Sequence, residues 1–479
     1  MRKTSARFHL TPTTGWLNDP NGPIFWKGRH HVFYQFDAES SWFGRMTWGH
    51  SSSTDLVNWE RHPVAIAPSD QGPDADGVWS GCVVDHDGIA TAIYTGVVTT
   101  ADGDRTQSVC LATSTDDDLV SWVKDSTNPV SVEPPPYEVK AFRDPFVWRD
   151  NGIWVMLLGT GLPNGCGAVF RYVSQDLRDW RYQGVFASGS PPVPGSPWTG
   201  SVWECPSLAM TESGEAVLLV SVHDPTTASL HFTTALIGEV TDGRLNVSSV
   251  QRVDHGHDCY AVALEKNSDG RILGYGWTWD AVSQANREEL GSTGALTIPR
   301  EMAVLGGALS IAPAAEVDRA FVVVHSSHAV SVVPGEPIEV AMPLSGRIHM
   351  TLTLDHASTV RIGVRKSATS GEELLIDYNP SRSTVIVDRR RASSDVGALG
   401  GISSADYLLP DDRRFDAIIF IDETIAEIFI GGALAFTERI YPQAIDAHFL
   451  RIEACNEHFG ERPASFVVDQ LEISMLAHA

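Results

Sequence analysis

STDLVNW, at Ser53–Trp59, is a polar turn closed by a tryptophan, and the same pattern occurs twice more along the chain. The second copy is STDDDLVSW at Ser114–Trp122, and the third is SQDLRDW at Ser174–Trp180. Their closing tryptophans are 63 and 58 residues apart, a period in or slightly above the range in which solenoids and propellers are expected. A coincidence of common hairpin residues is the alternative, and the near-equal spacing argues against it.

The segments between these turns are short and either apolar or alternating, which is typical of β-strands. Examples are His31–Phe36, Ile89–Tyr94 and Ile153–Leu158. Few windows before residue 310 carry the apolar stripe of an amphipathic helix. The repeating unit is therefore expected to be a small antiparallel sheet, and about five such units fill residues 1–310 at this period. The sequence predicts a five-bladed β-propeller over these residues.

The last third of the chain has a different composition. All 14 tryptophans lie before it, the last being Trp279. Alternating runs at 348–354 and 426–430 predict the strands of a β-sandwich. A chain of 479 residues is too long for one ordinary core, so a second domain is expected. We predict an all-β protein in which a linker at 311–325, able to form a short helix, joins the propeller to a sandwich at 326–479.

The formal net charge is −25, so nucleic acids and anionic membranes would be repelled by most of the surface. A neutral substrate fits this charge best. No apolar run is long enough to cross a bilayer, and the basic start at 1–7 leads into Phe8 without the apolar region of a secretory signal. A cytoplasmic location is expected, with secretion as the alternative if a leader has been removed. The oligomeric state stays open.

The six cysteines are scattered and form no CxxC pair. In a chain of this size they are expected to be small buried side chains rather than a disulfide framework. A zinc site is not predicted, because no clear set of ligands with metal-site spacing is present. We therefore expect neither a metal nor an organic cofactor.

Two aspartates precede prolines in motifs of chemical interest. Asp19 lies in WLNDPNG, at Trp16–Gly22, where the proline favours an extended backbone and Asn-Gly a tight turn, so the carboxylate is held at the end of a strand. Asp144 lies in FRDP, at Phe142–Pro145, beside an arginine. Each motif has an ordinary alternative, which is an Asx-Pro turn at Asp19 and a turn at the start of a strand at Asp144.

Glu204 follows a tryptophan and precedes a cysteine. A glutamate in these surroundings is expected to be partly desolvated, with a raised pKa that suits a general acid. The alternative is a glutamate on a half-exposed strand face. Glycoside hydrolysis gives the three acidic residues one purpose, because it needs a carboxylate at the anomeric carbon and a carboxylic acid at the leaving oxygen.

These motifs also carry a resemblance. WLNDPNG, FRDP and Glu204-Cys205 are similar, in order and spacing, to motifs of glycoside hydrolase family 32, the family of invertases, inulinases and levanases. Further similar segments are Trp48–His50, Trp79–Gly81, His255–Ala261, Gly276–Trp277, Ile298–Glu301, Phe420–Asp422 and Phe436–Ile440, so the resemblance covers nearly the whole chain. It implies a propeller, a sandwich and a retaining β-fructofuranosidase that acts on sucrose, fructo-oligosaccharides or fructans.

The resemblance assigns roles to the acidic residues. Asp19 would be the nucleophile that attacks C2 of the fructosyl unit, and Glu204 would protonate the leaving oxygen and then activate water. Asp144 would hold sugar hydroxyls and stabilise the transition state, with Arg143 tuning the charge nearby. The implied substrate-binding residues are Asn18, Gln35, Phe43, Trp48, Trp79, Ser80, Arg143 and Trp277.

The sequence departs from the family pattern at two places. Trp42-Phe43-Gly44 leaves the aromatic wall uncertain by one position, and Cys259 replaces the usual phenylalanine. Neither departure involves the carboxylates, so specificity is affected rather than chemistry. The alternatives are a fructosyltransferase, a fructan exo-hydrolase of the inulinase or levanase type, a propeller glycosidase of family 43, which WLNDPNG argues against, and a non-catalytic fructan-binding protein.

Overall fold

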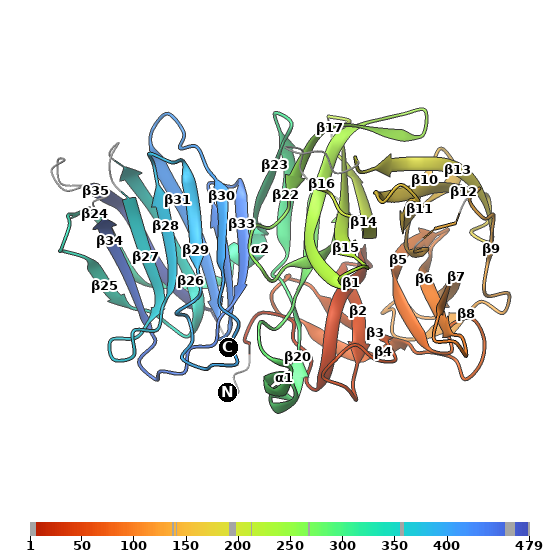
Figure 1. The fold of residues 1–479 in the computed structure, drawn as a ribbon, viewed down its shortest axis with the longest axis horizontal. Helices are drawn as coiled ribbons and strands as arrows, with labels where there is room; N and C mark the ends of the chain where they lie inside the picture. The colour runs from red at the N-terminus through yellow and green to blue at the C-terminus, as the bar shows by residue number, and fades with distance from the viewer. Residues whose placement is uncertain are drawn as a thin grey trace.

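A computed structural model gives the fold of the chain (Figure 1). It describes residues 6–136, 138–139, 141–190, 198–211, 213–266, 269–354, 359–455 and 465–477. Residues 1–5, which are most of the basic start that we compared with a secretory signal, therefore lie outside the described residues. Nearly all regular structure is β, and the two parts of the fold lie side by side in Figure 1.

The described residues of the first part form five small, mainly antiparallel sheets. Their strands are β1 Gly15–Trp26, β2 Arg29–Asp37, β3 Thr47–Ser53 and β4 Glu60–Ile66; β5 Gly77–His86, β6 Ile89–Thr99, β7 Arg105–Ser114 and β8 Trp122–Lys124; β10 Arg143–Asp150, β11 Ile153–Gly161, β12 Gly167–Ser174 and β13 Asp179–Ser188, with β9 Ser131–Val132; β14 Val202–Met210, β15 Ala216–Asp224, β16 Ser229–Thr241 and β17 Arg244–Arg252; and β18 Tyr260–Lys266, β19 Ile272–Thr278, β22 Arg300–Leu305 and β23 Ala308–Pro313, with β21 Ala295–Leu296.

The innermost strands close into a ring. β1 contacts β5, β5 contacts β10, β10 contacts β14, β14 contacts β18, and β18 contacts β1. After the helix α1 Gln284–Leu290, the short strand β20 Ser292–Thr293 pairs in parallel with β1, which joins the end of the ring to its beginning. The five sheets are thus the blades of a propeller, as predicted.

The repeated turn links the third and fourth strands of the first three blades. In each copy the aspartate side chain accepts backbone N–H groups of the turn, and the leucine has a positive φ and is buried. These leucines are Leu56, Leu119 and Leu177, with φ of 63°, 56° and 67°. A left-handed leucine is unfavourable by itself, so the aspartate hydrogen bonds and leucine burial must hold the turn. The sequence repeat therefore marks the same corner of three successive blades.

The second part is a sandwich of two six-stranded sheets. One sheet contains β24 Phe321–Val332, β35 Phe466–Leu476, β26 Ser345–Leu354, β31 Arg414–Asp422, β32 Ile425–Ile430 and β33 Leu434–Arg439; the other contains β25 Ile338–Ala341, β34 Phe449–Cys455, β27 Thr359–Lys366, β28 Leu374–Asn379, β29 Thr384–Asp388 and β30 Ile402–Asp406. Aliphatic side chains from both sheets form one buried core. The predicted all-β fold of a propeller followed by a sandwich is confirmed.

The connection between the two parts is shorter than expected. β23 ends at Pro313 and β24 begins at Phe321, so strands occupy both ends of the segment 311–325 that we expected to be linker. Helix α2, Ala315–Arg319, lies between them. Its Arg319 and Asp318 are polar, whereas Val317 is buried against the propeller core. No helix within the described ranges is long and apolar enough to cross a membrane.

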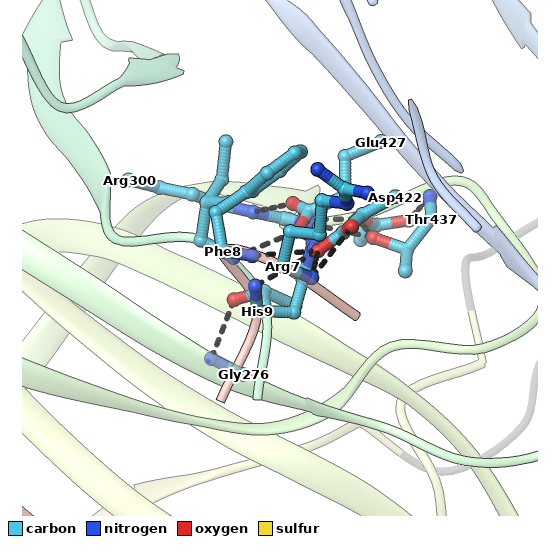
Figure 2. Close-up of polar contacts among 11 residues, drawn as sticks. Arg7, Phe8, His9, Gly276, Arg300, Asp422, Glu427 and Thr437 are labelled. Carbon is cyan, nitrogen blue, oxygen red and sulfur yellow. Dashed lines mark hydrogen bonds and ion pairs between the residues drawn. The ribbon is translucent and has the colours of Figure 1, made fainter. Parts of the chain in front are cut away.

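Buried ion pairs join the two parts, as Figure 2 shows. His9, from the segment before β1, places its Nδ1 2.9 Å from Asp422 Oδ2 and its Nε2 2.9 Å from Glu427 Oε1. Asp422 also accepts the backbone N–H groups of Arg7, Phe8 and His9. Arg300 of β22 pairs with Glu427 and with Asp254 of the propeller. The sandwich therefore holds both the beginning and the last blade of the propeller.

Candidate active site

A cavity of about 550 Å³ draws its lining from all five blades. Ten of the predicted site residues line it: Asn18, Asp19, Gln35, Phe43, Trp79, Ser80, Arg143, Asp144, Glu204 and Trp277. A second cavity of about 310 Å³ is lined by the residues that follow along the innermost strands, and it shares Ser80 and Asp144 with the first. The acidic residues therefore lie where the central channel of the propeller opens into the larger cavity.

Trp48 was expected among the substrate-binding residues, and this expectation is wrong. Its side chain is fully buried and is absent from the cavity lining. It packs on Phe33 and Tyr94, and its Nε1 donates to the carbonyl of Trp79 at 3.0 Å. Trp48 therefore supports the strand that carries Trp79 and does not face the cavity.

The innermost strands share a local irregularity that aims side chains into the cavity. Regular pairing is interrupted between Leu17 and Pro20 in β1, Trp79 and Gly81 in β5, Arg143 and Phe146 in β10, Glu204 and Ser207 in β14, and Tyr260 and Ala263 in β18. Such β-bulges turn a side chain away from the regular alternation. Asp144 and Cys205 have φ of 62° and 49° at these bulges. The five bulges bring chemically active residues of distant sequence to one level of the ring.

Asp19 lies on β1 and faces the other two acidic residues. Its Oδ2 accepts the Ser80 hydroxyl at 3.1 Å and lies 3.6 Å from the thiol of Cys205. Burial and the negative charge of Glu204 raise the pKa of Asp19 to about 6, although hydrogen bonds from Asn18 and Ser80 oppose the shift. Asn18 is itself oriented by Trp16, whose Nε1 donates to its Oδ1 at 2.8 Å.

Asp144 lies at the start of β10 in a left-handed conformation that its backbone contacts hold. Its N–H donates to Thr95 Oγ1 at 2.8 Å, and its Oδ2 accepts the N–H of Cys205 at 2.9 Å. Burial raises the pKa of Asp144 to about 7, and the charge of Glu204 adds to this effect while Arg143 opposes it. This carboxyl therefore has an enhanced affinity for a proton near neutral pH.

Glu204 on β14 is the most strongly hydrogen-bonded of the three carboxylates. Its Oε1 accepts Arg143 Nε at 3.0 Å and Nη2 at 2.6 Å, and its Oε2 accepts the hydroxyl of Tyr260 at 2.7 Å. Burial acts to raise the pKa of Glu204, but Arg143, His223 and Tyr260 outweigh it and lower the pKa below its usual value. The expected raised pKa is therefore wrong, because the residues that flank Glu204 in the sequence do not reveal its contact with Arg143.

The cavity is also lined by side chains that were not among the predicted site residues. They are Trp16, Trp42, Arg105, Gln107, His223 and Tyr260. Tyr260 had a signal, since it lies in the segment His255–Ala261 that resembles the family. Arg105 and Gln107 had none beyond their alternation on one strand, and His223 is separated from Glu204 by a whole hairpin. The contact of Gln107 with Arg143 joins two neighbouring blades, whereas His223 meets Glu204 across the hairpin of β14 and β15.

Two buried polar atoms of the lining have no protein partner among the described residues. They are Gln35 Oε1 and Trp277 Nε1. Gln35 is held in place because its Nε2 donates to the carbonyl of Val78 at 3.1 Å. A buried acceptor and a buried donor without partners are unfavourable unless water or a ligand satisfies them. The cavity thus presents aromatic surfaces together with hydrogen-bonding groups, as a sugar requires.

Known proteins are similar to this chain in sequence and in architecture. The glycosyl hydrolases family 32 N-terminal domain matches residues 9–313, and the family 32 C-terminal domain matches residues 323–471. Sucrose-6-phosphate hydrolase of Zymomonas mobilis is 32% identical over 460 residues, covering 91% of this chain and 86% of that protein. Raffinose invertase of Escherichia coli is 31% identical over 473 residues, covering 93% and 92%.

Solved structures agree with this relationship. The family 32 β-fructofuranosidase of Bombyx mori superimposes with a TM-score of 0.78 at 26% identity, covering 98% of this chain and 94% of that one. The match extends through both the propeller and the sandwich, and the resemblance read from the motifs is confirmed. This chain belongs to glycosyl hydrolase family 32.

Proposed function

We propose that this glycoside hydrolase is a retaining β-fructofuranosidase that releases terminal β-fructosyl units from sucrose and fructo-oligosaccharides. The observation that carries the proposal is the convergence of Asp19, Asp144 and Glu204 in one cavity with aromatic walls. Relatives named sucrose-6-phosphate hydrolase and raffinose invertase, together with β-fructofuranosidase structures, support the same substrate class. The ligand is a small carbohydrate, and neither nucleic acid nor a membrane has a part in the reaction.

In the first step Asp19 attacks C2 of the fructosyl unit as a carboxylate. A bond forms between its oxygen and C2 while the bond from C2 to the leaving oxygen breaks, and the leaving oxygen takes the proton of Glu204. The pKa of about 6 leaves most Asp19 ionised at neutral pH. Asp144 accepts hydrogen bonds from sugar hydroxyls and stabilises the positive charge that develops on the ring.

In the second step water attacks C2 on the face that the leaving sugar occupied, opposite the bond to Asp19. Glu204, now a carboxylate, takes a proton from the water, and the bond between C2 and Asp19 breaks, so the anomeric configuration is retained. Glu204 must hold a proton before the first step, whereas Arg143 lowers its pKa and disfavours that proton. Mutual repulsion favours a shared proton among the three carboxylates, and a leaving oxygen beside Glu204 would draw it to that residue.

Fructose release from sucrose, kestose, inulin and levan tests the proposal. We expect sucrose or short oligosaccharides to be cleaved, with proton NMR showing β-fructose as the first product. Inversion would contradict the role of Asp19, and no release from any substrate would favour a fructan-binding protein. Mainly oligosaccharide products at high sucrose would indicate a fructosyltransferase, and preference for inulin or levan a fructan exo-hydrolase. The location that we propose is the cytoplasm, testable by fractionation of the source cells.

A further inference from the structure

The segment that closes the ring of blades is held by the sandwich domain. This ring-closing segment, residues 280–294, contains helix α1 and strand β20. The N–H of Leu399 donates to the carbonyl of Ala281 at 2.8 Å, and the N–H of Ser283 donates to the carbonyl of Gly397 at 2.8 Å. In Figure 1, α1 and β20 lie on the side of the propeller that faces the sandwich. Ring closure is therefore coupled to the second domain.

Asp280, the first residue of the ring-closing segment, is a buried carboxylate with partners in both domains. Its Oδ1 accepts hydrogen bonds from the guanidinium of Arg439 and, at 2.9 Å, from the hydroxyl of Tyr441, both of which belong to the sandwich. Its Oδ2 accepts the backbone N–H of Gly294 at 2.6 Å. One carboxylate thus ties the two ends of the ring-closing segment together and attaches both to the sandwich.

Gly294, the last residue of this segment, lies against the strand that carries the nucleophile. It has a φ of 82°, and a β-carbon at this position would lie 1.8 Å from the carbonyl oxygen of Leu17, two residues before Asp19. Only glycine fits so close to another backbone. The carbonyl of Gly291 also accepts the N–H of Gly15 at 3.0 Å. The ring-closing segment therefore fixes the backbone of β1 immediately before Asp19.

Trp16 links this contact to the nucleophile itself. It pairs with Thr293 of β20, and its Nε1 donates to Asn18 Oδ1 at 2.8 Å. Asn18 in turn forms a hydrogen bond with the carboxylate of Asp19, which lowers the pKa of Asp19. A nucleophile must lie about 3–3.5 Å from the carbon that it attacks, and a misplacement of about 1 Å can lower the rate roughly 100-fold. Movement of β20 would therefore reach the reacting atom through Trp16 and Asn18.

We propose that Asp280 is a positioning residue for the nucleophile Asp19, and that Arg439 and Tyr441 of the sandwich hold Asp280 in place. The inference rests on the proposed fructosidase function. The described residues that line the cavity do not include Asp280, so it acts through Gly294 and β1 rather than on the substrate. The sandwich is thereby required for the full activity of the propeller, beyond its contribution to stability.

Steady-state kinetics of Tyr441→Phe test the proposal with a mild change. The variant removes one of the hydrogen bonds that Asp280 accepts, and kcat for the preferred substrate should fall roughly 10-fold with little change in KM, because the nucleophile acts in the chemical step. The acid limb of the pH–kcat profile should move to higher pH, because a weaker hydrogen bond from Asn18 raises the pKa of Asp19.

Tyr378→Phe is the matched control. It removes a hydroxyl that donates to the carbonyl of Tyr407 at 3.2 Å, a contact made within the sandwich. This variant makes the same chemical change away from the ring-closing segment. It should keep the kcat and the acid limb of the native protein.

Variants of Arg439 make the larger change. Arg439→Met removes the cation beside Asp280, and kcat of the folded fraction should fall roughly 100-fold. Arg439→Lys should recover part of this loss, because it keeps the charge without the planar fork. Arg300→Met breaks another buried ion pair between the domains, and its partners Glu427 and Asp254 lie outside the ring-closing segment. It should keep the native kcat in the folded fraction, and Tyr441→Phe decides the test if Arg439→Met does not fold.

Hydrogen exchange of backbone amides, measured by mass spectrometry, needs no turnover and separates this inference from the proposed function. Peptides that cover residues 15–19 should exchange faster in Tyr441→Phe than in the native protein, whereas those of β12 should not change. Native exchange over residues 15–19, an unchanged kcat and acid limb in Tyr441→Phe, or an equal loss of kcat in Tyr378→Phe would overturn the inference. If exchange changes as expected but no substrate releases fructose, the proposed function fails while the connection from Asp280 to β1 stands.

Discussion

Two of the buried carboxylate clusters, one at the domain interface and one in the cavity, differ in the donors that surround them. At the domain interface, Asp422 and Glu427 receive hydrogen bonds from His9, Arg300 and backbone N–H groups. Burial acts to raise the pKa of both, but these contacts lower each below its usual value. In the cavity, Asp19 and Asp144 have too few donors to offset burial and mutual repulsion, and the pKa of each is raised.

The direction of the pKa shift differs between Asp422 and Glu427, which join the domains, and Asp19 and Asp144, which line the cavity. A buried carboxylate that accepts hydrogen bonds from cations and N–H groups resists protonation. A buried carboxylate that lacks such compensation is poised to exchange a proton or to attack a carbon. Acidic residues alone therefore do not mark an active site. Asp19 and Asp144 have fewer donors around them than Asp422 and Glu427 have, and substitutions at each cluster test this contrast.

The largest expected effect belongs to Asp19→Asn. Loss of the nucleophile should lower kcat by roughly 10⁴- to 10⁶-fold, as removal of a catalytic nucleophile does elsewhere. Because folding raises the pKa of Asp19, its charge is unfavourable in the native protein, and the free energy of unfolding should be unchanged or higher. Fructose release and thermal unfolding measure the two quantities. Near-native turnover would refute the role of Asp19, and a large loss of stability would refute the contrast between the clusters.

Arg300→Met should give the largest loss of stability. It leaves Glu427 and Asp254 without their shared cation in a fully buried position, which typically costs about 3–5 kcal/mol. Urea unfolding should show this loss, while kcat of the folded fraction stays near that of the native protein. Arg271→Met removes an arginine from partly exposed ion pairs and serves as the control, with a loss of about 1 kcal/mol or less. An equal loss in both variants would mean that the buried network is not special.

Tyr260→Phe should have an intermediate effect confined to the cavity. It removes the hydroxyl that donates to Glu204 Oε2 at 2.7 Å. With one donor fewer, the pKa of Glu204 should rise, and the alkaline limb of the pH–rate profile should move to higher pH. We expect kcat to fall by roughly 10-fold, the value of one hydrogen bond to a charged group. An unchanged limb would show that Tyr260 does not act through Glu204.

The smallest effects are those of pH, and their signs differ between the clusters. Activity should rise as Asp19 ionises near pH 6 and fall as the cluster loses its last proton above about pH 7, giving a bell-shaped kcat/KM. The interface behaves otherwise. The lowered pKa values of Asp422 and Glu427 contribute stability above their unfolded values of 3.8 and 4.5, and this contribution is lost as pH falls through the folded values.

His9 makes a contribution to stability that depends on pH in the opposite direction. Burial acts to lower its pKa, but Asp422 and Glu427 raise it above the usual value of 6.5. Its contribution to stability is therefore complete below pH 6.5 and is lost as pH rises through the raised value. Urea unfolding across pH 5–9 measures the free energy of unfolding of the native protein and of His9→Gln. The difference between these two free energies should shrink at high pH. A difference that grows at high pH would contradict a charged His9.

Much of the fold and of the chemistry was accessible from the sequence. The turn repeat at Ser53–Trp59 predicts blades because its aspartate and tryptophan act locally, within one hairpin. Asp19, Asp144 and Glu204 were identified because each lies in a short motif whose proline or cysteine neighbours accompany it in the chain. Features that depend only on residues near one another in the chain, such as these turns and motifs, can be predicted from the sequence.

Only the tertiary structure decided what each side chain touches. Trp48 is buried and donates to the carbonyl of Trp79, so it does not face the cavity. The pKa of Glu204 is lowered because Arg143, from another blade, donates hydrogen bonds to it. The partners of His9 are likewise set by contacts between residues far apart in sequence. Burial and electrostatic shifts depend on distances in space, and ring closure and domain packing set those distances, so residue order along the chain does not express them.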